Sequence, residues 1–196
     1  MPTFISLFAI YIVSSIVSMF LTSTPIELFT VAGVAIWLPL SALTLVPLVD
    51  VMRSFTQDAA EKVGIPFKKT ATLMLSVSMV VAFLCVLFAG LPLPIFVGVL
   101  AAVTIGGAAD ILVFRKMGEF FKSPVARMAF SNFAATIIGS GIVFFVAFTD
   151  WFFTNNAMAR PINEVVVGWL AQSVFIWASS IVLGAVIQKA KNVIAK

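Results

Sequence analysis

The feature that most constrains this chain is a series of long apolar stretches, each about as long as a lipid bilayer is thick. A spanning helix needs about 20 mostly apolar residues. Six stretches meet that length, at roughly 3–22, 28–49, 70–89, 92–114, 126–148 and 165–188. Of the 196 residues, 62% are apolar and only 10% are charged, whereas about 25% are charged in a soluble domain. The sequence therefore predicts an all-α, polytopic membrane protein, with one domain of six transmembrane helices over residues 1–196.

The positions of the basic residues predict how the helices are oriented. Of the 12 Lys and Arg residues, only Arg160 falls in a first, third or fifth link; the others fall in the second link, the fourth link and the C-terminal tail. Under the positive-inside rule this bias places both termini in the cytoplasm, in a multi-pass protein of the inner (cytoplasmic) membrane. The net charge of +4 is explained by this topology and gives no reason to expect a nucleic-acid partner. The charges at 57–62 are expected to be solvated, on a short amphipathic helix at the inner surface.

Two prolines, Pro39 and Pro47, interrupt the second apolar stretch. A proline inside a helix removes one backbone donor and clashes with the preceding turn. The stretch is therefore either a kinked helix or a discontinuous helix of the kind in which transporters bind their cargo. Trp37 lies near the middle of this stretch, where it serves either as a stacking platform for a flat ligand or as packing.

Two amide side chains, Asn132 and Gln172, lie inside the fifth and sixth apolar stretches, with Thr44 and Thr136 at comparable depth in the second and fifth. Polar groups inside lipid are expensive and are functional-site hypotheses by default. Amide edges together with aromatic side chains suit a flat, neutral, hydrogen-bonding ligand. The alternative is that the amides only join neighbouring helices.

Acidic and basic side chains near the cytoplasmic side form a second group. Asp50 and Arg53 are one turn apart and can meet on one helix face. Asp110 lies near the inner boundary, with Arg115 within two turns of it. These four residues are expected to form an inner gate or structural ion pairs. Small residues at 102 and 106 share the face of Asp110 and predict a close helix neighbour there.

Several classes of function are disfavoured. The chain has no His and one Cys, so no disulfide within the chain and no His-based metal site is available. No nucleophile–base motif and no paired intramembrane carboxylates are present, so we expect no catalytic residue, metal or cofactor. A cation pore needs rings of acids and an anion pore needs rings of bases, and neither pattern occurs.

One stretch carries a resemblance to a known family. Asp110, Val113 and Phe114 form an Asp-x-x-Val-Phe motif that is followed by bases. Further matches in the next stretch are Ser131, Ser140, Phe144, Phe145, Ala147 and Phe148. In these motifs, and in Asp50 before a basic loop, the chain resembles the queuosine precursor transporter (VUT) family. The resemblance implies a six-helix carrier of 7-deazaguanine precursors, such as 7-cyano- and 7-aminomethyl-7-deazaguanine. The family's mid-helix Asp aligns with Gly139 here, which leaves the identity of the substrate open.

The sequence thus predicts a secondary uptake carrier for a nucleobase-like molecule. Its expected substrate-binding residues are Trp37, Thr44, Asn132, Thr136, Ser140 and Gln172, and its expected gate or ion-pair residues are Asp50, Arg53, Asp110 and Arg115. One alternative is the substrate-binding subunit of an energy-coupling-factor transporter, with Ser14 and Ser18 as a docking face for an ATPase module. Another is a membrane scaffold whose polar residues only join helices. The driving ion and the oligomeric state, a homo-oligomer included, are left open by the sequence.

Overall fold

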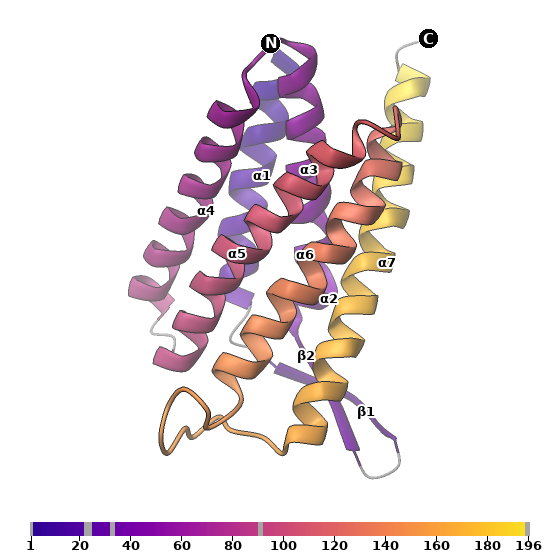
Figure 1. Cartoon of the computed structure of the whole chain (residues 1–196). Helices are drawn as coiled ribbons and strands as arrows, with labels where there is room; N and C mark the ends of the chain where they lie inside the picture. Colours follow the sequence, from indigo (N-terminus) through magenta and orange to yellow (C-terminus); the bar gives the residue numbers. More distant parts are fainter. Residues whose placement is uncertain (1, 22–24, 32–33, 90–91, 195–196) are drawn as a thin grey trace.

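The protein is an elongated helical bundle with one β-hairpin at its end (Figure 1). A computed structural model describes residues 2–21, 25–31, 34–89 and 92–194. Its helices and strands are α1 (Pro2–Leu21), β1 (Pro25–Val31), β2 (Val34–Pro39), α2 (Leu40–Thr44), α3 (Val46–Lys62), α4 (Phe67–Ala89), α5 (Leu93–Met117), α6 (Pro124–Ala147) and α7 (Ile162–Ile194). The expected predominance of helix is confirmed, since 81% of the structure is helical.

The structure contradicts the single helix expected over 28–49. Strands β1 and β2 form an antiparallel hairpin in which Pro25 pairs with Pro39, and the 5-residue helix α2 and the 17-residue helix α3 follow. The two prolines explain the difference, because each stands at a boundary and not at a kink. Pro39 precedes α2 with an extended backbone, and Pro47 lies in the first turn of α3, where a missing backbone donor is harmless.

Helix α3 also extends beyond the expected boundary. It continues without a break to Lys62, so the separate surface helix expected at 57–62 does not exist. Gln57 and Asp58 are only 7% and 5% exposed, which corrects the expectation that the polar side chains here are solvated. Both face neighbouring helices because α3 packs against α1, α4, α6 and α7.

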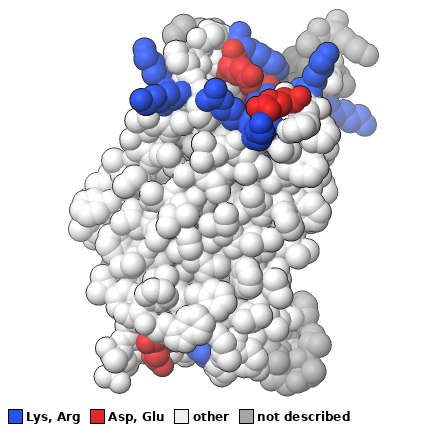
Figure 2. Space-filling view, viewed as in Figure 1, with Lys and Arg blue, Asp and Glu red and all other residues white. Residues whose placement is uncertain are grey.

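Among the described residues, four helices are long and apolar enough to cross a membrane: α4, α5, α6 and α7. Helix α1 contributes a shorter apolar segment, Thr3–Ser18. The protein is therefore a multi-pass membrane protein. In Figure 1, α1 and the α2–α3 segment run along the same bundle, and α1 begins at the end of the bundle where α7 finishes. Figure 2 shows most charged side chains at that end, and a broad uncharged band separates them from a few at the other end.

Helices α5 and α6 pack more closely than ordinary side chains allow. A Cβ atom added to Gly106 would lie 3.0 Å from Gly139 Cα and 3.3 Å from the Ala135 carbonyl oxygen. A Cβ added to Gly139 would come no closer than 3.7 Å, to the carbonyl oxygen of Ala102. The small side chains that the sequence places on one face of each helix therefore meet across this contact.

This asymmetry predicts opposite outcomes for two alanine substitutions. Gly106→Ala should destabilise the protein by about 1–3 kcal/mol, because the new methyl group overlaps the backbone of α6. Gly139→Ala should be neutral or slightly stabilising, because its methyl group has room and alanine favours a helix. Thermal unfolding of both variants in the same detergent measures the difference, and an equal loss in both would contradict the close contact at Gly106.

Candidate functional site

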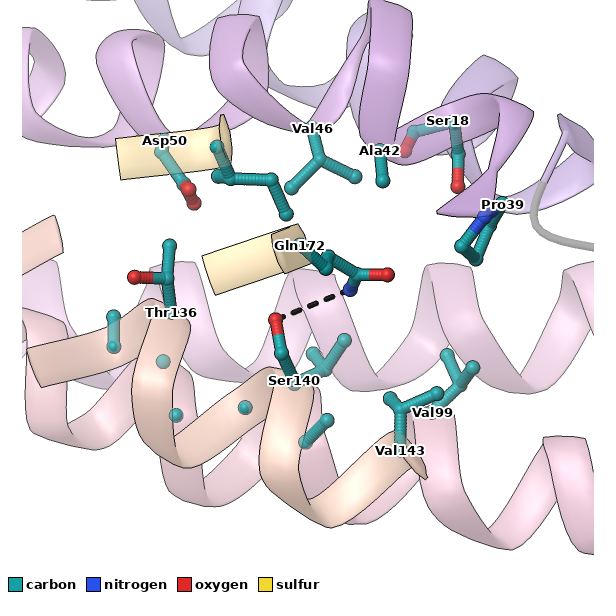
Figure 3. Close-up of a pocket in the computed structure, with 18 of the residues that line it drawn as sticks. Ser18, Pro39, Ala42, Val46, Asp50, Val99, Thr136, Ser140, Val143 and Gln172 are labelled. Atoms are coloured by element: carbon teal, nitrogen blue, oxygen red, sulfur yellow. Dashed lines mark hydrogen bonds between the residues drawn. The ribbon is translucent and has the colours of Figure 1, made fainter. Parts of the chain in front are cut away.

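A cavity of about 150 Å³ lies inside the bundle (Figure 3). Side chains from α1, β2, α2, α3, α5, α6 and α7 line it. Most of the wall is apolar, from residues such as Ala42, Val46, Val99 and Val143. Its size resembles that of a known cavity that binds one benzene ring. The cavity therefore matches a small ring compound in size.

The cavity wall carries a small set of polar groups from α6 and α7. Gln172 Nε2 donates a hydrogen bond to Ser140 Oγ at 3.1 Å, which joins the two helices across the cavity (Figure 3). Gln172 Oε1 is buried and has no hydrogen-bond partner among the described residues. Thr136, which also lines the cavity, donates to the Asn132 carbonyl oxygen at 2.7 Å. A buried acceptor without a partner is costly, so the amide of Gln172 is suited to receive a ligand donor.

Charged side chains mark one end of the cavity. Asp50 and Arg53 line it, and Figure 3 shows Asp50 at the end opposite Ser18 and Pro39. Arg53 Nη1 lies 3.5 Å from Asp50 Oδ1 and 3.4 Å from Asp110 Oδ2. One guanidinium thus lies between two carboxylates.

This charged cluster links α3 to α5. The Arg53 side chain is 10% exposed and the Asp110 side chain is fully buried. Arg53 also lies 5.9 Å from the centre of the Tyr11 ring on α1, and the Tyr11 hydroxyl is hydrogen-bonded to Ser78 on α4. Four helices therefore meet through contacts of Arg53 and Tyr11.

The expected partnership between Asp110 and Arg115 is wrong. Asp110 pairs with Arg53, and the Arg115 guanidinium lies 4.3 Å from the centre of the Phe67 ring on α4. The reason is helix geometry: at about 100° per residue, positions five apart lie on different faces. The small residues of α5 do share the face of Asp110, and they pack against α6. The cation that pairs with Asp110 nevertheless comes from α3.

Two of the expected substrate-binding residues, Thr44 and Asn132, lie away from the cavity, and a third cannot be placed. Thr44 is exposed and donates back to the Leu40 carbonyl oxygen at 2.8 Å. Asn132 is fully buried outside the cavity wall and donates to Ser180 Oγ at 3.0 Å, so it joins α6 to α7. The side chain of Trp37 lies outside the described residues, although its backbone belongs to β2.

The cavity also includes residues that the sequence reasoning missed or assigned to another role. Ser18 was expected only in the alternative docking face, and Ser41 and Gly106 were not expected at the site; all three line the cavity. A serine or glycine in an apolar helix has the same appearance whether it faces a ligand or a neighbouring helix. The position of Ser41 two residues after Pro39 is the one available signal, because a proline break often exposes backbone and side-chain polar groups.

The chemistry available in the cavity is that of binding. It offers an amide, hydroxyl groups and one arginine that is held by carboxylates, within an apolar wall. Within the described ranges, no group of three His, Cys, Asp or Glu side chains is placed to hold a metal ion. The arrangement suits recognition of a neutral polar molecule by a few hydrogen bonds.

The charged cluster predicts an unequal effect of two neutralising substitutions. Arg53→Gln should destabilise the protein by about 3–5 kcal/mol, because it leaves two buried acids without a cation. Asp50→Asn should cost much less, because it leaves Arg53 paired one to one with Asp110. Unfolding of the two purified variants, compared with the unsubstituted protein, tests this, and equal losses would show that Arg53 does not compensate both acids.

Comparisons with known proteins give no relative for this chain. No protein-family model matches it, and neither a curated protein nor a solved structure matches it significantly.

Proposed function

We propose that this protein is a membrane carrier that imports a small, flat, hydrogen-bonding solute across the inner membrane by secondary transport. The observation that carries the proposal is the cavity inside the bundle with the unpartnered Gln172 Oε1 in its wall. The cargo we propose is a 7-deazaguanine precursor of queuosine, either the 7-cyano or the 7-aminomethyl compound. That choice is taken from the resemblance at Asp110 to Phe114 and Ser131 to Phe148.

The polar groups of the cavity suit such a cargo. A deazaguanine presents donors and acceptors along its ring edge, and a primary amide offers both a donor and an acceptor. Gln172 can accept from the ligand through Oε1 while Nε2 keeps its bond to Ser140. The apolar wall formed by Val46, Val99 and Val143 suits the faces of a ring.

The cavity also has the surroundings that a moving carrier needs. One part of its wall comes from short elements, at Pro39 and Ala42, and another part from the long helices α5 to α7. Breaks next to a binding site are common in secondary transporters, where one part of the protein moves against the other. In our proposal Asp50, Arg53 and Asp110 form the inner gate, and Arg115 does not belong to it.

The alternatives are less well supported. For an energy-coupling-factor subunit, Ser14 and Ser18 were the proposed docking face, yet they are only 5% and 6% exposed. Their side chains face the bundle and offer no surface to an ATPase module. For a scaffold, buried polar groups need only join helices, as Asn132 does with Ser180, and both Asn132 and Gln172 leave an amide oxygen without a partner among the described residues. Gln172 differs because it lines the cavity, where a ligand can reach its amide.

Uptake rescue tests the carrier and its site together. A bacterium that lacks both precursor synthesis and its own carrier would express this chain, receive either precursor, and be assayed for queuosine in its tRNA. We expect rescue, and we expect Gln172→Leu to reduce initial uptake by about tenfold or more at equal protein level, because a buried hydrogen bond to the cargo is lost. Thr44→Val is the matched control and should transport normally, since Thr44 lies outside the cavity wall.

Two other outcomes would contradict parts of the proposal. No rescue by a correctly inserted protein would exclude these precursors as cargo. Rescue that is equally impaired in Thr44→Val and Gln172→Leu would move the binding site away from the cavity.

A further inference from the structure

A second cavity lies at the charged end of the bundle and belongs to neither the central cavity nor the gate. Its volume is about 290 Å³, and its wall comes from α3, the α3–α4 turn, α4, α5 and α6. In Figure 1, α3 and α5 finish, and α4 and α6 begin, at the end of the bundle that carries most of the charges in Figure 2. Two arginines, Arg115 and Arg127, are part of its wall.

Both arginines lie over aromatic rings, although Arg127 also donates from Nε to the Phe114 carbonyl oxygen at 3.3 Å. The Arg115 guanidinium lies 4.3 Å from the centre of the Phe67 ring, and that of Arg127 lies 4.2 Å from the centre of the Phe114 ring. A guanidinium over an aromatic face is attracted by the ring and does not use its N–H groups for that contact. The rings therefore position two planar cations at the cavity.

The two cations differ in how far they are neutralised. Arg127 Nη2 lies 2.9 Å from Glu61 Oε2, and Arg127 Nη1 lies 3.9 Å from Asp58 Oδ1. Arg115 has no carboxylate within ion-pair distance in the described part of the chain. The charged residues of the wall are two arginines, Arg115 and Arg127, and one acid, Glu61. The wall therefore carries more positive than negative charge.

Buried polar side chains of the wall also lack partners. Gln57 Nε2 and Thr70 Oγ1 have no hydrogen-bond partner among the described residues, and these residues are only 7% and 4% exposed. Unpaired polar groups at such depth are costly and unusual in native proteins. Together with Arg115, they give a wall rich in donors, which suits a ligand rich in acceptors and negative in charge.

We propose that this second cavity binds a phosphate group, presented either by the headgroup of an anionic lipid or as a soluble ion. Arginine forks match the geometry of phosphate oxygens, and Gln57 and Thr70 supply neutral donors to the same anion. The surroundings also suit a lipid. Leu112 on α5 and Leu73 on α4 are three residues from Arg115 and Thr70, on the same helix faces, and are 61% and 42% exposed. Acyl chains would lie against these leucines with the phosphate above them.

Two probes distinguish the sources of the phosphate. The purified full chain in neutral detergent would be titrated with phosphatidylglycerol and observed by native mass spectrometry. In parallel, thermal unfolding would be followed with inorganic phosphate, against chloride at the same ionic strength. For a lipid site we expect bound phosphatidylglycerol that Arg115→Gln weakens by about tenfold or more. For a soluble-ion site we expect inorganic phosphate to raise the unfolding temperature, and Arg115→Gln to abolish that rise.

Two further variants make the test specific. Lys116→Gln removes the same charge from the adjacent residue, whose Nζ is paired with Glu119 outside the cavity, and should leave binding unchanged. Thr70→Val removes the unpartnered hydroxyl at nearly constant volume. It should raise the unfolding temperature without ligand and reduce the stabilisation by the bound phosphate.

The proposal is independent of the carrier function, and three results would overturn it. One is equal weakening of binding by Arg115→Gln and Lys116→Gln, which would indicate general attraction to a basic surface. Another is full phosphate stabilisation of Thr70→Val. The third is an absence of binding by either probe to the folded protein.

Discussion

The position of Arg53 between Asp50 and Asp110 is the interaction on which the arrangement of the bundle depends. A carboxylate as deeply buried as Asp110 is tolerated only where a cation reaches it. Here the cation comes from α3. Pro39 ends the preceding strand, β2, and Pro47 lies in the first turn of α3. The pair therefore fixes where α3 lies against α5, and so the depth of the charged end of the central cavity.

The close contact between α5 and α6 explains why a cavity remains between these helices and α7. At Gly106 and Gly139 the two backbones nearly touch, so α6 cannot move further towards α5. On its other side α6 is held to α7 by Gln172 with Ser140 and by Asn132 with Ser180. The position of α6 is thus set by backbone contact with α5 on one side and by polar side chains of α7 on the other. The part of the cavity wall that α6 supplies includes the small residues Ala135, Gly139 and Ser140.

Some of this was predictable from the sequence, and the failures have physical causes. Long apolar stretches identify α4 to α7 because lipid selects for length and hydropathy alone. The stretch at 28–49 is also apolar but forms most of a hairpin, the short helix α2 and the start of α3, because two prolines interrupt it. Residues that share a helix face, such as the small ones of α5, were correctly grouped. Partners across helices were not: Asp110 receives Arg53 instead of Arg115, and Asn132 faces Ser180 instead of the cavity. The spacing of residues in the sequence determines which side chains share one face of a helix, but it does not determine which other helix packs against that face.

The two cavities differ in which polar groups of their walls lack a hydrogen-bond partner among the described residues. This difference is the reason why we propose different classes of ligand for them. In the central cavity the arginine is matched by two acids, and the unpartnered atom in its wall is an amide oxygen. A neutral molecule with a donor would complete that site, whereas an anion would face the carboxylate of Asp50. At the charged end the relation is reversed, because Arg115 lacks an acid, and Gln57 and Thr70 carry unused donor groups. In our proposals the same bundle therefore takes a neutral solute in its interior and an anion at its base-rich end.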